Sequence, residues 1–204
     1  LGRDFYSPPD TGLYLSLLLR PRQMQPQHAT RITTMAALAA CEAIEAVTQQ
    51  QPQIKWVNDI FLEGKKVCGI LTEGSFNLET GQLDDVVVGV GFNVYPPAGG
   101  FPPEIAEIAV SILQKQHSGT KNKLAAAFLN FFFQIYREEN DYASAYRARS
   151  MVIGKSIVVS TPTASRNASA LDIDRDCRLI VRYEDGSIAS LSSAEVSIRT
   201  EGMR

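Results

Sequence analysis

The sequence predicts an α/β (α+β) protein: a mixed β-sheet with packed helices over residues 1–150, followed by a small SH3-like β-barrel over residues 151–204. Two glycine-punctuated apolar segments, at 67–71 and 85–94, have the length and composition of sheet strands. Helical patterns lie on either side of them along the chain. After residue 151, about fifty residues of short strand patterns predict the barrel.

The first elements follow from apolar patterning. Residues 13–19, LYLSLLL, form a nearly continuous apolar run of strand length, which predicts a central strand covered on both faces. Residues 30–51 are rich in helix formers and carry their apolar residues mostly on one face. Pro52 ends this amphipathic helix, which is expected to pack on the sheet.

Two further helices are predicted after the central strands. Residues 104–116 carry isoleucines at helical spacing, and residues 121–140 carry a stronger stripe at i, i+4, i+7 and i+11. The residues of this second stripe are Leu124, Phe128, Phe131 and Ile135. The successive phenylalanines 131–133 are expected to pack in the core rather than to form a binding site.

The composition changes after a predicted hinge at residues 147–150. Short β segments then follow at 156–160, 168–173, 178–183, 187–191 and 195–199. Asp185-Gly186, between two of them, is a strong hairpin signal.

Charge and cysteine content narrow the classes of function. The 204 residues carry 20 basic and 22 acidic side chains, so a net charge of −2 gives no electrostatic reason to bind nucleic acid or membrane. Three separated cysteines without a C-x-x-C disfavour a disulfide framework or zinc site and indicate a reducing cytoplasm. The first residues lack the apolar core of a signal peptide, and no apolar run reaches the ~18 residues of a membrane span.

A binding site is predicted around the central strands. Glycine weakens a strand unless a ligand or another backbone approaches it closely, which is the interpretation for Gly69, Gly89 and Gly91. Lys55, next to the amide and carboxyl side chains of Asn58 and Asp59, enters this sheet where it can meet a buried anion.

Other chemistries have little support in the sequence. His28 and His117 both lie in polar linker or helix-end contexts, which disfavours a Ser-His-Asp triad. A phosphate loop of the G-x-x-x-x-G-K-[ST] type is absent from the sequence. Cys68 lies inside an apolar strand and is interpreted as buried packing rather than as a nucleophile.

Three motifs together resemble the biotin protein ligases. They are Lys55-Trp56-x-Asn58-Asp59, Lys66-Val67-Cys68-Gly69-Ile70-Leu71-x-Glu73 and Gly89-x-Gly91-x-Asn93, in this order. The segment 194–199, AEVSIR, resembles the end of that family's C-terminal module, with Ala194 in place of glycine; Val57 stands where the family has proline. The resemblance implies the class II synthetase-like biotin/lipoate ligase fold. Gly2-Arg3 and Phe5-x-Ser7-Pro8 resemble the end of the family's ligand-binding loop, so we expect the chain to begin inside that loop.

The resemblance implies an ATP-dependent biotin–[acetyl-CoA-carboxylase] ligase of the cytoplasm. Such an enzyme forms biotinyl-5'-AMP from biotin and ATP with Mg²⁺. It then transfers biotin to one lysine of the biotin carboxyl carrier protein of acetyl-CoA carboxylase. The family contains both monomers and sheet-extending homodimers. Many bacterial relatives also carry an N-terminal DNA-binding domain, a pattern that residues 1–204 do not contain.

The resemblance also assigns site residues. Lys55 is expected to be the catalytic cation, which stabilises the anionic oxygens of both steps. The expected biotin-binding residues are Arg3, Gly12, Tyr14, Ser16, Lys55, Gly69, Ile70 and Gly89. The expected ATP-binding residues are Phe5, Asn58, Asp59, Gly91 and Asn93, with Mg²⁺ near Asn58 and Asp59. Two simpler interpretations stay open, a plain core strand for Ser16 and an Asn-Asp turn at 58–59.

Two alternative functions remain at this stage. One is a lipoate or octanoate ligase of the same fold, although those enzymes typically lack the joined K-W-x-N-D and K-x-x-G-I-L motifs. The other is a non-catalytic biotin-binding sensor, which would bind its ligand without releasing pyrophosphate.

Overall fold

The computed structural model describes residues 6–21, 29–77, 79, 81–138, 141–161 and 163–199. Within them, five strands form a first sheet in the spatial order β1-β5-β4-β3-β2. These strands are β1 (Gly12–Leu19), β2 (Gln53–Lys55), β3 (Asp59–Leu62), β4 (Lys65–Phe76) and β5 (Leu83–Asn93). The predicted α/β architecture is confirmed, with the sheet at its centre.

The strand pairs of this sheet are all antiparallel, which corrects the expected mixed pairing. For the consecutive strands β2 to β5, short connections explain the difference, since a parallel pair needs a crossover of a dozen or more residues. Between β3 and β4 only Glu63 and Gly64 intervene, both with positive φ (50° and 77°). Two such residues build the tight turn that matches the twist of the flanking strands.

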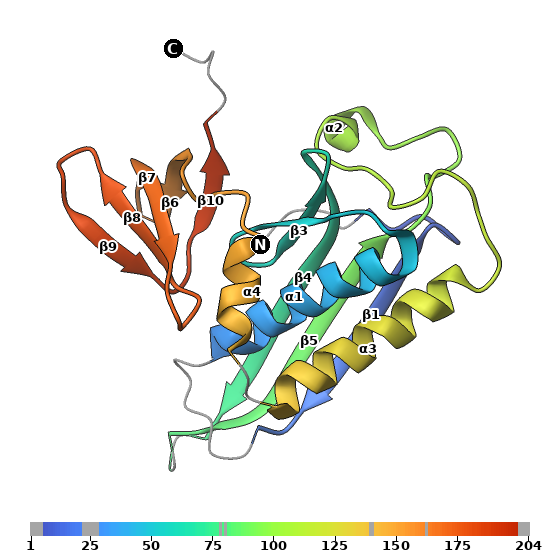
Figure 1. The fold of residues 1–204 in the computed structure, drawn as a ribbon, viewed down its shortest axis with the longest axis horizontal. Coiled ribbons are helices and arrows are strands. Elements are labelled where there is room, and N and C mark those ends of the chain that lie inside the picture. Colours follow the sequence, from blue (N-terminus) through green and yellow to red (C-terminus); the bar gives the residue numbers. More distant parts are fainter. Residues whose placement is uncertain are drawn as a thin grey trace.

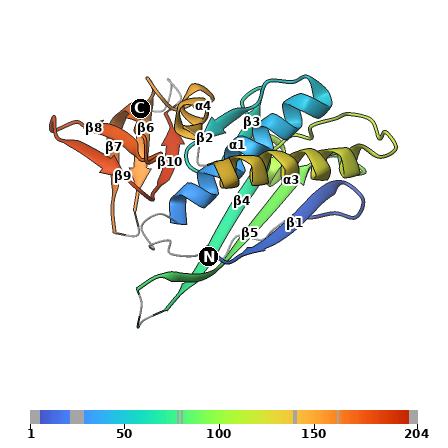
Figure 2. The same cartoon turned by 60° about the horizontal axis from the view of Figure 1, so that its bottom comes forward.

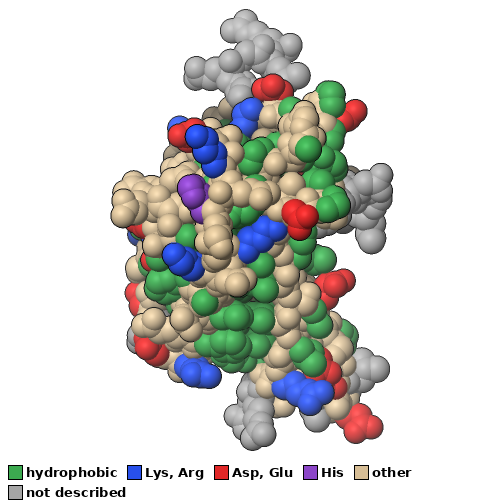
Figure 3. All heavy atoms as spheres, turned by 90° about the vertical axis from the view of Figure 1, so that its right-hand side faces the viewer, with side chains coloured by type: hydrophobic (Ala, Val, Ile, Leu, Met, Phe, Trp, Pro, Cys, Tyr) green, Lys and Arg blue, Asp and Glu red, His purple; other side chains and the backbone are tan. Residues whose placement is uncertain are grey.

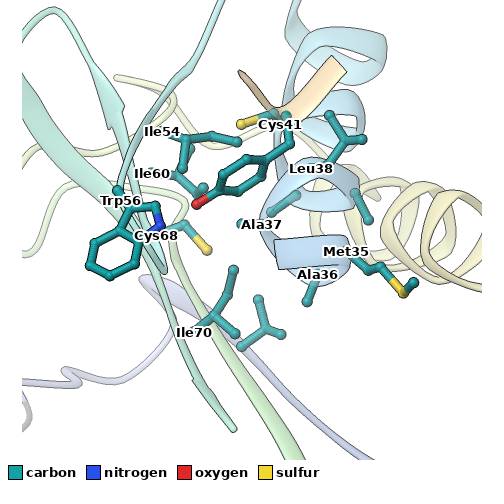
Figure 4. Packing of buried hydrophobic residues seen from close by; sticks show 14 of the residues in the cluster. Met35, Ala36, Ala37, Leu38, Cys41, Ile54, Trp56, Ile60, Cys68 and Ile70 are labelled. Atoms are coloured by element: carbon teal, nitrogen blue, oxygen red, sulfur yellow. The ribbon is translucent and has the colours of Figure 1, made fainter. Parts of the chain in front are cut away.

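Two helices cover one face of the first sheet. They are α1 (Ala29–Thr48) and α3 (Thr120–Glu138), which lie side by side over β1, β5 and β4 (Figures 1 and 2). Their apolar faces meet the inward side chains of the strands. Figure 4 shows Ala37 and Cys41 of α1 facing Ile60, Cys68 and Ile70 of the sheet.

The strand β1 lies at the edge of the sheet rather than at its centre, which corrects the prediction from its apolar run. Alternate side chains turn away from the helices, and Tyr14 and Leu18 are exposed by 43% and 61%. Leu13, Leu15 and Leu17 pack against the core from the other face. The continuous apolar run therefore reflects one packed face and one open face of the strand.

The helix expected at 104–116 is reduced to α2 (Pro103–Ala106), one short turn after the proline pair. The following residues bond to the sheet instead. Lys66 N donates to Ile108 O at 2.8 Å, and Val110 N donates to Lys66 O at 3.0 Å. The free edge near the start of β4 supplies hydrogen-bond partners that compete with a helix, so the isoleucine spacing did not decide the structure.

The helix α3 buries a slightly different stripe from the one predicted. Leu124, Phe128 and Phe132 are buried, whereas Phe131 and Ile135 pack at the margin of the core. Phe128 meets Phe92 of β5 edge to face, with ring centroids 5.9 Å apart. The phenylalanines are thus core residues, as expected.

A second sheet follows the helix α4 (Tyr142–Ala148). In the described residues it has the strand order β10-β6-β7-β8-β9 and lies beside the first sheet (Figure 1). Its strands are β6 (Ser156–Ser160), β7 (Ser165–Ile173), β8 (Leu179–Tyr183), β9 (Ile188–Leu191) and β10 (Glu195–Ile198). They match the predicted short segments, and the predicted hairpin at Asp185-Gly186 joins β8 to β9.

The predicted hinge at 147–150 is not a loose connection. Arg147 belongs to α4, and the Arg149 guanidinium binds Glu42 and Glu45 of α1 at 2.8 and 2.5 Å. The backbone of this segment also pairs with the outer edge of β2, since Ile54 N donates a hydrogen bond to Arg149 O at 2.7 Å. The polypeptide is therefore fastened to both α1 and β2 where it enters the second sheet.

Hydrophobic side chains also reach the surface. Seen from the right-hand side of Figure 1, green side chains gather over one area of the molecule and charged side chains lie around its margins (Figure 3). The large exposed hydrophobics among the described residues are Tyr6, Tyr14, Leu18, Leu71, Phe76, Val87, Ile108 and Ile188. None of the described helices has the length and apolarity that crossing a membrane requires.

Candidate functional site

The strand register brings the predicted glycines together on the face of the sheet opposite the helices. Tyr14 pairs with Gly91, Gly91 with Gly69, and Gly69 with Asp59 in one row across four strands. Directly paired residues in antiparallel strands point their side chains to the same face. The middle of this row therefore consists of glycines, and the row itself places no side chain over the strand backbone there.

The next row continues this floor. Ser16 pairs with Gly89, and Gly89 pairs with Leu71. A Cβ added at Gly89 would meet only Leu71 O, at 3.6 Å. Within 4 Å of this Cβ position, the described part of the chain therefore places no side chain.

This floor is the base of a cavity of about 610 Å³. Its volume is within the range of small-molecule sites, roughly 300–1,000 Å³. The lining residues come from β1 and the segment before it, from β3 and the turn before it, from β4 and β5, and from the segment around α2. They are Tyr6, Tyr14, Leu15, Ser16, Asn58, Asp59, Lys66, Cys68, Gly69, Ile70, Leu71, Gly89, Val90, Gly91, Asn93, Phe101, Ile105, Ile108 and Ala109.

One ion pair lies on the floor. Lys66 Nζ is 2.6 Å from Asp59 Oδ1, and these side chains are 40% and 25% exposed. The lysine side chain folds over Gly69, because a Cβ built there would lie 3.1 Å from Lys66 Cε and Nζ. A partly screened ammonium is thus held on the pocket floor by a carboxylate.

Hydrogen bonds fix the turn that carries Asn58. Asn58 Nδ2 donates to Ile70 O at 2.6 Å, and Ile70 N donates to Asn58 O at 3.0 Å. This side chain holds β4 in register with the turn before β3. The peptide bond between Trp56 and Val57, at the start of this turn, is cis.

Asn93 lies at the end of β5 and also lines the cavity. Its Nδ2 donates to Lys66 O at 3.4 Å. The amide therefore ties the end of β5 to the backbone of the residue that carries the pocket cation.

The structure does not place Lys55 among the lining residues of the cavity, where the central cation was expected. Lys55 shares a face with Asp59, its partner in the register, but β2 is the edge strand of the sheet. Its Nζ lies 5.9 Å from the centroid of the Phe61 ring, outside the lining residues. Lys66, by contrast, lines the cavity.

Gly12 also lies outside the cavity lining. The Tyr14 ring folds back over it, and a Cβ at Gly12 would approach Tyr14 Oη to 2.3 Å. Gly12 thus makes room for Tyr14, which does line the cavity. Arg3 and Phe5 fall outside the described residues.

Cys68 is buried, and burial raises the pKa of its thiol well above the usual range. A protonated thiol is a poor nucleophile, which agrees with its interpretation as packing. Within the described part of the chain, no group of three or more His, Cys, Asp or Glu side chains is arranged to hold a metal ion.

One wall of the cavity was missed by sequence reasoning. Tyr6 and Phe101 lie with ring centroids 6.4 Å apart, and Ile105 and Ile108 continue this apolar wall. Ile108 is 60% exposed although its segment is bonded to Lys66. The proline-rich break before α2 was the only sequence signal that this segment leaves the regular layers.

The site combines an apolar cavity, an exposed strand backbone and one ammonium–carboxylate pair. Such an arrangement suits a ligand with an apolar body and an anionic group placed at Lys66. Asp59, the only carboxylate among the lining residues described, keeps the lysine in place until the ligand arrives.

Comparison with protein families agrees with this architecture. The model of the Biotin/lipoate A/B protein ligase family matches residues 1–93. The model of the Biotin protein ligase C terminal domain matches residues 152–199. The first match contains the strands that form the pocket floor, and the second contains the second sheet.

Individual proteins are similar over most of the chain. The Biotin--[acetyl-CoA-carboxylase] ligase of Paracoccus denitrificans is 32% identical over 196 residues, covering 91% of this chain and 79% of that protein. The Bifunctional ligase/repressor BirA of Bacillus spizizenii is 30% identical over 206 residues, covering 97% of this chain. The chain spans 62% of the length of that relative.

Among solved structures, the biotin protein ligase from Aquifex aeolicus in complex with biotin and ATP is similar. It has a TM-score of 0.73 at 22% sequence identity and covers 93% of this chain and 78% of its own. At this identity the similarity concerns the fold.

Proposed function

The chain belongs to the biotin protein ligase family, and on this premise we propose that it is an ATP-dependent biotin–[acetyl-CoA-carboxylase] ligase. The observation that carries the proposal is the glycine floor with Lys66 above it. Biotin has a compact bicyclic body, made of a thioether ring and a polar ureido ring, and an aliphatic chain that ends in a carboxylate. The cavity offers an apolar lining with one cation at the floor, which matches that distribution of charge.

Two steps would occur at this site. A carboxylate oxygen of biotin attacks the α-phosphorus of ATP, the bond to the β-phosphate oxygen breaks, and pyrophosphate leaves. The neutral amine of an acceptor lysine then attacks the acyl carbon of biotinyl-5'-AMP. The bond from this carbon to the phosphate oxygen breaks, AMP leaves, and the amine proton passes to solvent. The product is an amide bond between biotin and the lysine.

Lys66 is the residue proposed to assist both steps. The first step brings anionic oxygens together, and the second develops an oxyanion, so a fixed cation stabilises each transition state. In the free site this ammonium is held by Asp59 at 2.6 Å. The ligand carboxylate is expected to replace Asp59 as its principal partner.

The remaining lining residues divide into two groups in the proposal. Tyr14, Ser16, Gly69, Ile70 and Gly89 lie where the body of biotin would rest. The nucleotide would lie toward Gly91 and Asn93, with its base against the wall of Tyr6 and Phe101. Aromatic side chains provide flat apolar contact area for a base.

Mg²⁺ is proposed to arrive with ATP rather than in a protein cage. Magnesium is commonly bound through one or two carboxylates together with substrate phosphates and water. Asp59 meets this requirement as the carboxylate of the cavity, while the Asn58 amide is engaged by Ile70 O. Asp59 would exchange Lys66 for the metal as the ligands enter.

The proposed acceptor is a lysine of a biotin carboxyl carrier protein, and the proposed location is the cytoplasm. We also propose residues 1–150 as the ligase domain and residues 151–204 as the C-terminal barrel. A homodimer stays a prediction.

The experiment compares two lysines in the same chain. Pyrophosphate release is measured with ATP, magnesium and either biotin, lipoate or octanoate, for the parent chain, Lys66→Ala and Lys55→Ala. We expect release with biotin, a loss of about 10²- to 10³-fold for Lys66→Ala, and little change for Lys55→Ala. Binding of each ligand with a non-hydrolysable ATP analogue is followed by calorimetry alongside.

Other outcomes would overturn the proposal. A preference for lipoate or octanoate would assign the chain to that branch of the fold. Saturable biotin binding without pyrophosphate release would indicate a sensor. A loss of pyrophosphate release confined to Lys55→Ala would assign the catalytic role to Lys55 on the edge strand β2.

A further inference from the structure

The turn that leads into the pocket, residues 56–58, has one side toward the cavity and one side buried. Asn58 and the following Asp59 face the cavity. On the other side, the Trp56 ring is 3% exposed and reaches the hydrophobic core. What holds this turn from behind therefore influences where the pocket carboxylate and its lysine lie.

One hydrogen bond from α4 reaches the turn. Tyr146 Oη donates to Val57 O at 2.9 Å, and Tyr146 is fully buried. Burial raises the pKa of this phenol well above its usual range, so the hydroxyl keeps its proton and remains a donor. A buried carbonyl without a partner is costly, which makes this contact a strong restraint on the turn.

A second hydrogen bond comes from the loop between β7 and β8. Trp56 Nε1 donates to Cys177 O at 2.9 Å, and this contact is buried. Cys177 has φ = +58°, an uncommon backbone conformation for a side chain other than glycine. The barrel thus presents a backbone carbonyl to the ligase side of the molecule.

The conformation of this loop is held by Asp174. Its Oδ1 accepts from Asp176 N and Arg178 N at 2.9 Å each, and its Oδ2 accepts from Arg178 Nε at 2.8 Å. Cys177 N donates to Asp174 O at 2.9 Å and closes the turn. Bonds within the barrel therefore help to fix the Cys177 carbonyl, and the Cys177 side chain also contacts Thr34 and Tyr142.

We propose that Tyr146 and the Asp174–Arg178 loop are positioning elements for the ligation site, acting through the turn 56–58 on Asp59 and Lys66. Neither touches the cavity. Their hydrogen bonds hold the back of the turn, whereas Asn58 and Ile70 hold its front through paired bonds of 2.6 and 3.0 Å. The barrel then contributes to the reaction from behind the sheet. The kinetic part of this inference rests on the proposed ligase function.

The main test is a matched pair of tyrosine substitutions in α4. Tyr146→Phe removes the hydroxyl bound to Val57 O. Tyr142→Phe removes another buried hydroxyl of the same helix, which lies 3.1 Å from Thr34 Oγ1 on α1. Both variants lose a buried hydrogen bond, but only the first loses a bond to the turn.

A positioning role of Tyr146 and a purely stabilising role predict different kinetic results for this pair of variants. If Tyr146 positions the site, Tyr146→Phe lowers kcat for pyrophosphate release by about ten- to a hundredfold with the KM for biotin nearly unchanged. Tyr142→Phe, whose hydroxyl contacts the Cys177 side chain but not the turn, lowers kcat much less than Tyr146→Phe at a temperature where both variants are folded. Equal kcat values for the two variants would overturn the inference.

A measurement without turnover separates this inference from the proposed function. The Ile70 amide donates to Asn58 O, so its hydrogen exchange reports the order of the turn. We expect exchange at Ile70 to speed up at least tenfold in Tyr146→Phe and to stay unchanged in Tyr142→Phe. A chain without ligase activity that shows this difference would contradict the proposed function and keep the structural link. The same exchange rate in both variants would refute the link itself.

The loop is tested by two aspartates of the barrel. Asp174→Ala removes the acceptor that organises the Cys177 loop, whereas Asp185→Ala removes an equivalent acceptor in the β8–β9 hairpin, where Asp185 Oδ1 binds Ser187 N at 2.9 Å. We expect Asp174→Ala to lower kcat severalfold and Asp185→Ala to leave it unchanged. Similar kcat values for both aspartate variants would remove the barrel from the proposal.

Discussion

The two faces of β4 and β5 carry different kinds of residue. On the face toward the helices, Cys68, Val90 and Phe92 are all at most 3% exposed and fill the core. On the other face, Gly69, Gly89 and Gly91 leave the backbone open beneath the cavity. Because side chains alternate along a strand, one pair of strands supplies both the core and the floor of the site.

This alternation separates stability from binding. Side chains on the helix face contribute apolar burial, whereas the glycines of the other face contribute none. Glycine inside a strand costs stability relative to other residues. Substitutions on the two faces are therefore expected to change different measured quantities.

Phe92→Ala should have the largest effect and should act on stability. The Phe92 ring is fully buried and meets Phe128 edge to face. Removing a buried phenylalanine side chain costs about 3–5 kcal/mol in the free energy of unfolding. Urea denaturation measures this loss. Below the lowered melting temperature, biotin affinity should stay close to that of the parent chain, and a large loss of affinity in the folded variant would break the separation of the two faces.

Gly89→Val should show the opposite behaviour. A Cβ at Gly89 finds ordinary van der Waals distance to Leu71 O, at 3.6 Å, and valine favours strands. The unfolding free energy should stay the same or rise slightly. The valine methyl groups would occupy the cavity, so biotin affinity should fall by about 100-fold, or ~2.7 kcal/mol. Calorimetry measures the affinity, and unchanged binding would move biotin away from Gly89.

The layers of the fold were predictable because they depend on patterns that repeat. The α1 and α3 helices, the strands β1, β4 and β5, the strands of the second sheet and the Asp185-Gly186 hairpin followed from periodicity and turn residues, whereas the short strands β2 and β3 were not predicted. The α2 segment did not follow from them, since residues 108–110 bond to Lys66 of β4 instead of continuing a helix. Competition between a helix and a distant strand edge involves residues far apart in the sequence, which local spacing does not reveal.

The glycines that line the cavity were predictable from the sequence, but the lysine that lines it was not. Gly69, Gly89 and Gly91 could be named because glycine in a strand has a direct physical reason, whereas Asn93 was named from the motif resemblance. The choice between Lys55 and Lys66 depended on strand order, and β2 lies at the sheet edge while β4 lies inside. A bulge between β3 and β4 also shifts the register near Lys66. Neither feature has a signature in the sequence around the two lysines.

The smallest predicted effect concerns the contact between the floor and its cation. In Gly69→Ala, the added methyl group would lie 3.1 Å from Lys66 Cε and Nζ, so the end of the lysine must move by a few tenths of an ångström. A flexible side chain makes this shift at low cost, and the unfolding free energy should change by less than about 1 kcal/mol. The ammonium is nevertheless moved relative to the ligand carboxylate, so biotin affinity should fall about three- to tenfold, or ~0.7–1.4 kcal/mol.

The matched control for this variant is the Gly69→Ala change made in the Lys66→Ala background. In Lys66→Ala the Gly69→Ala change has no ammonium to displace, so it should weaken biotin binding further by less than about twofold, or ~0.4 kcal/mol. A double-mutant cycle from calorimetric affinities measures this coupling. Additive losses in binding free energy would mean that the methyl group weakens binding by contacting biotin directly. Displacement of the Lys66 ammonium would then not explain the effect of Gly69→Ala.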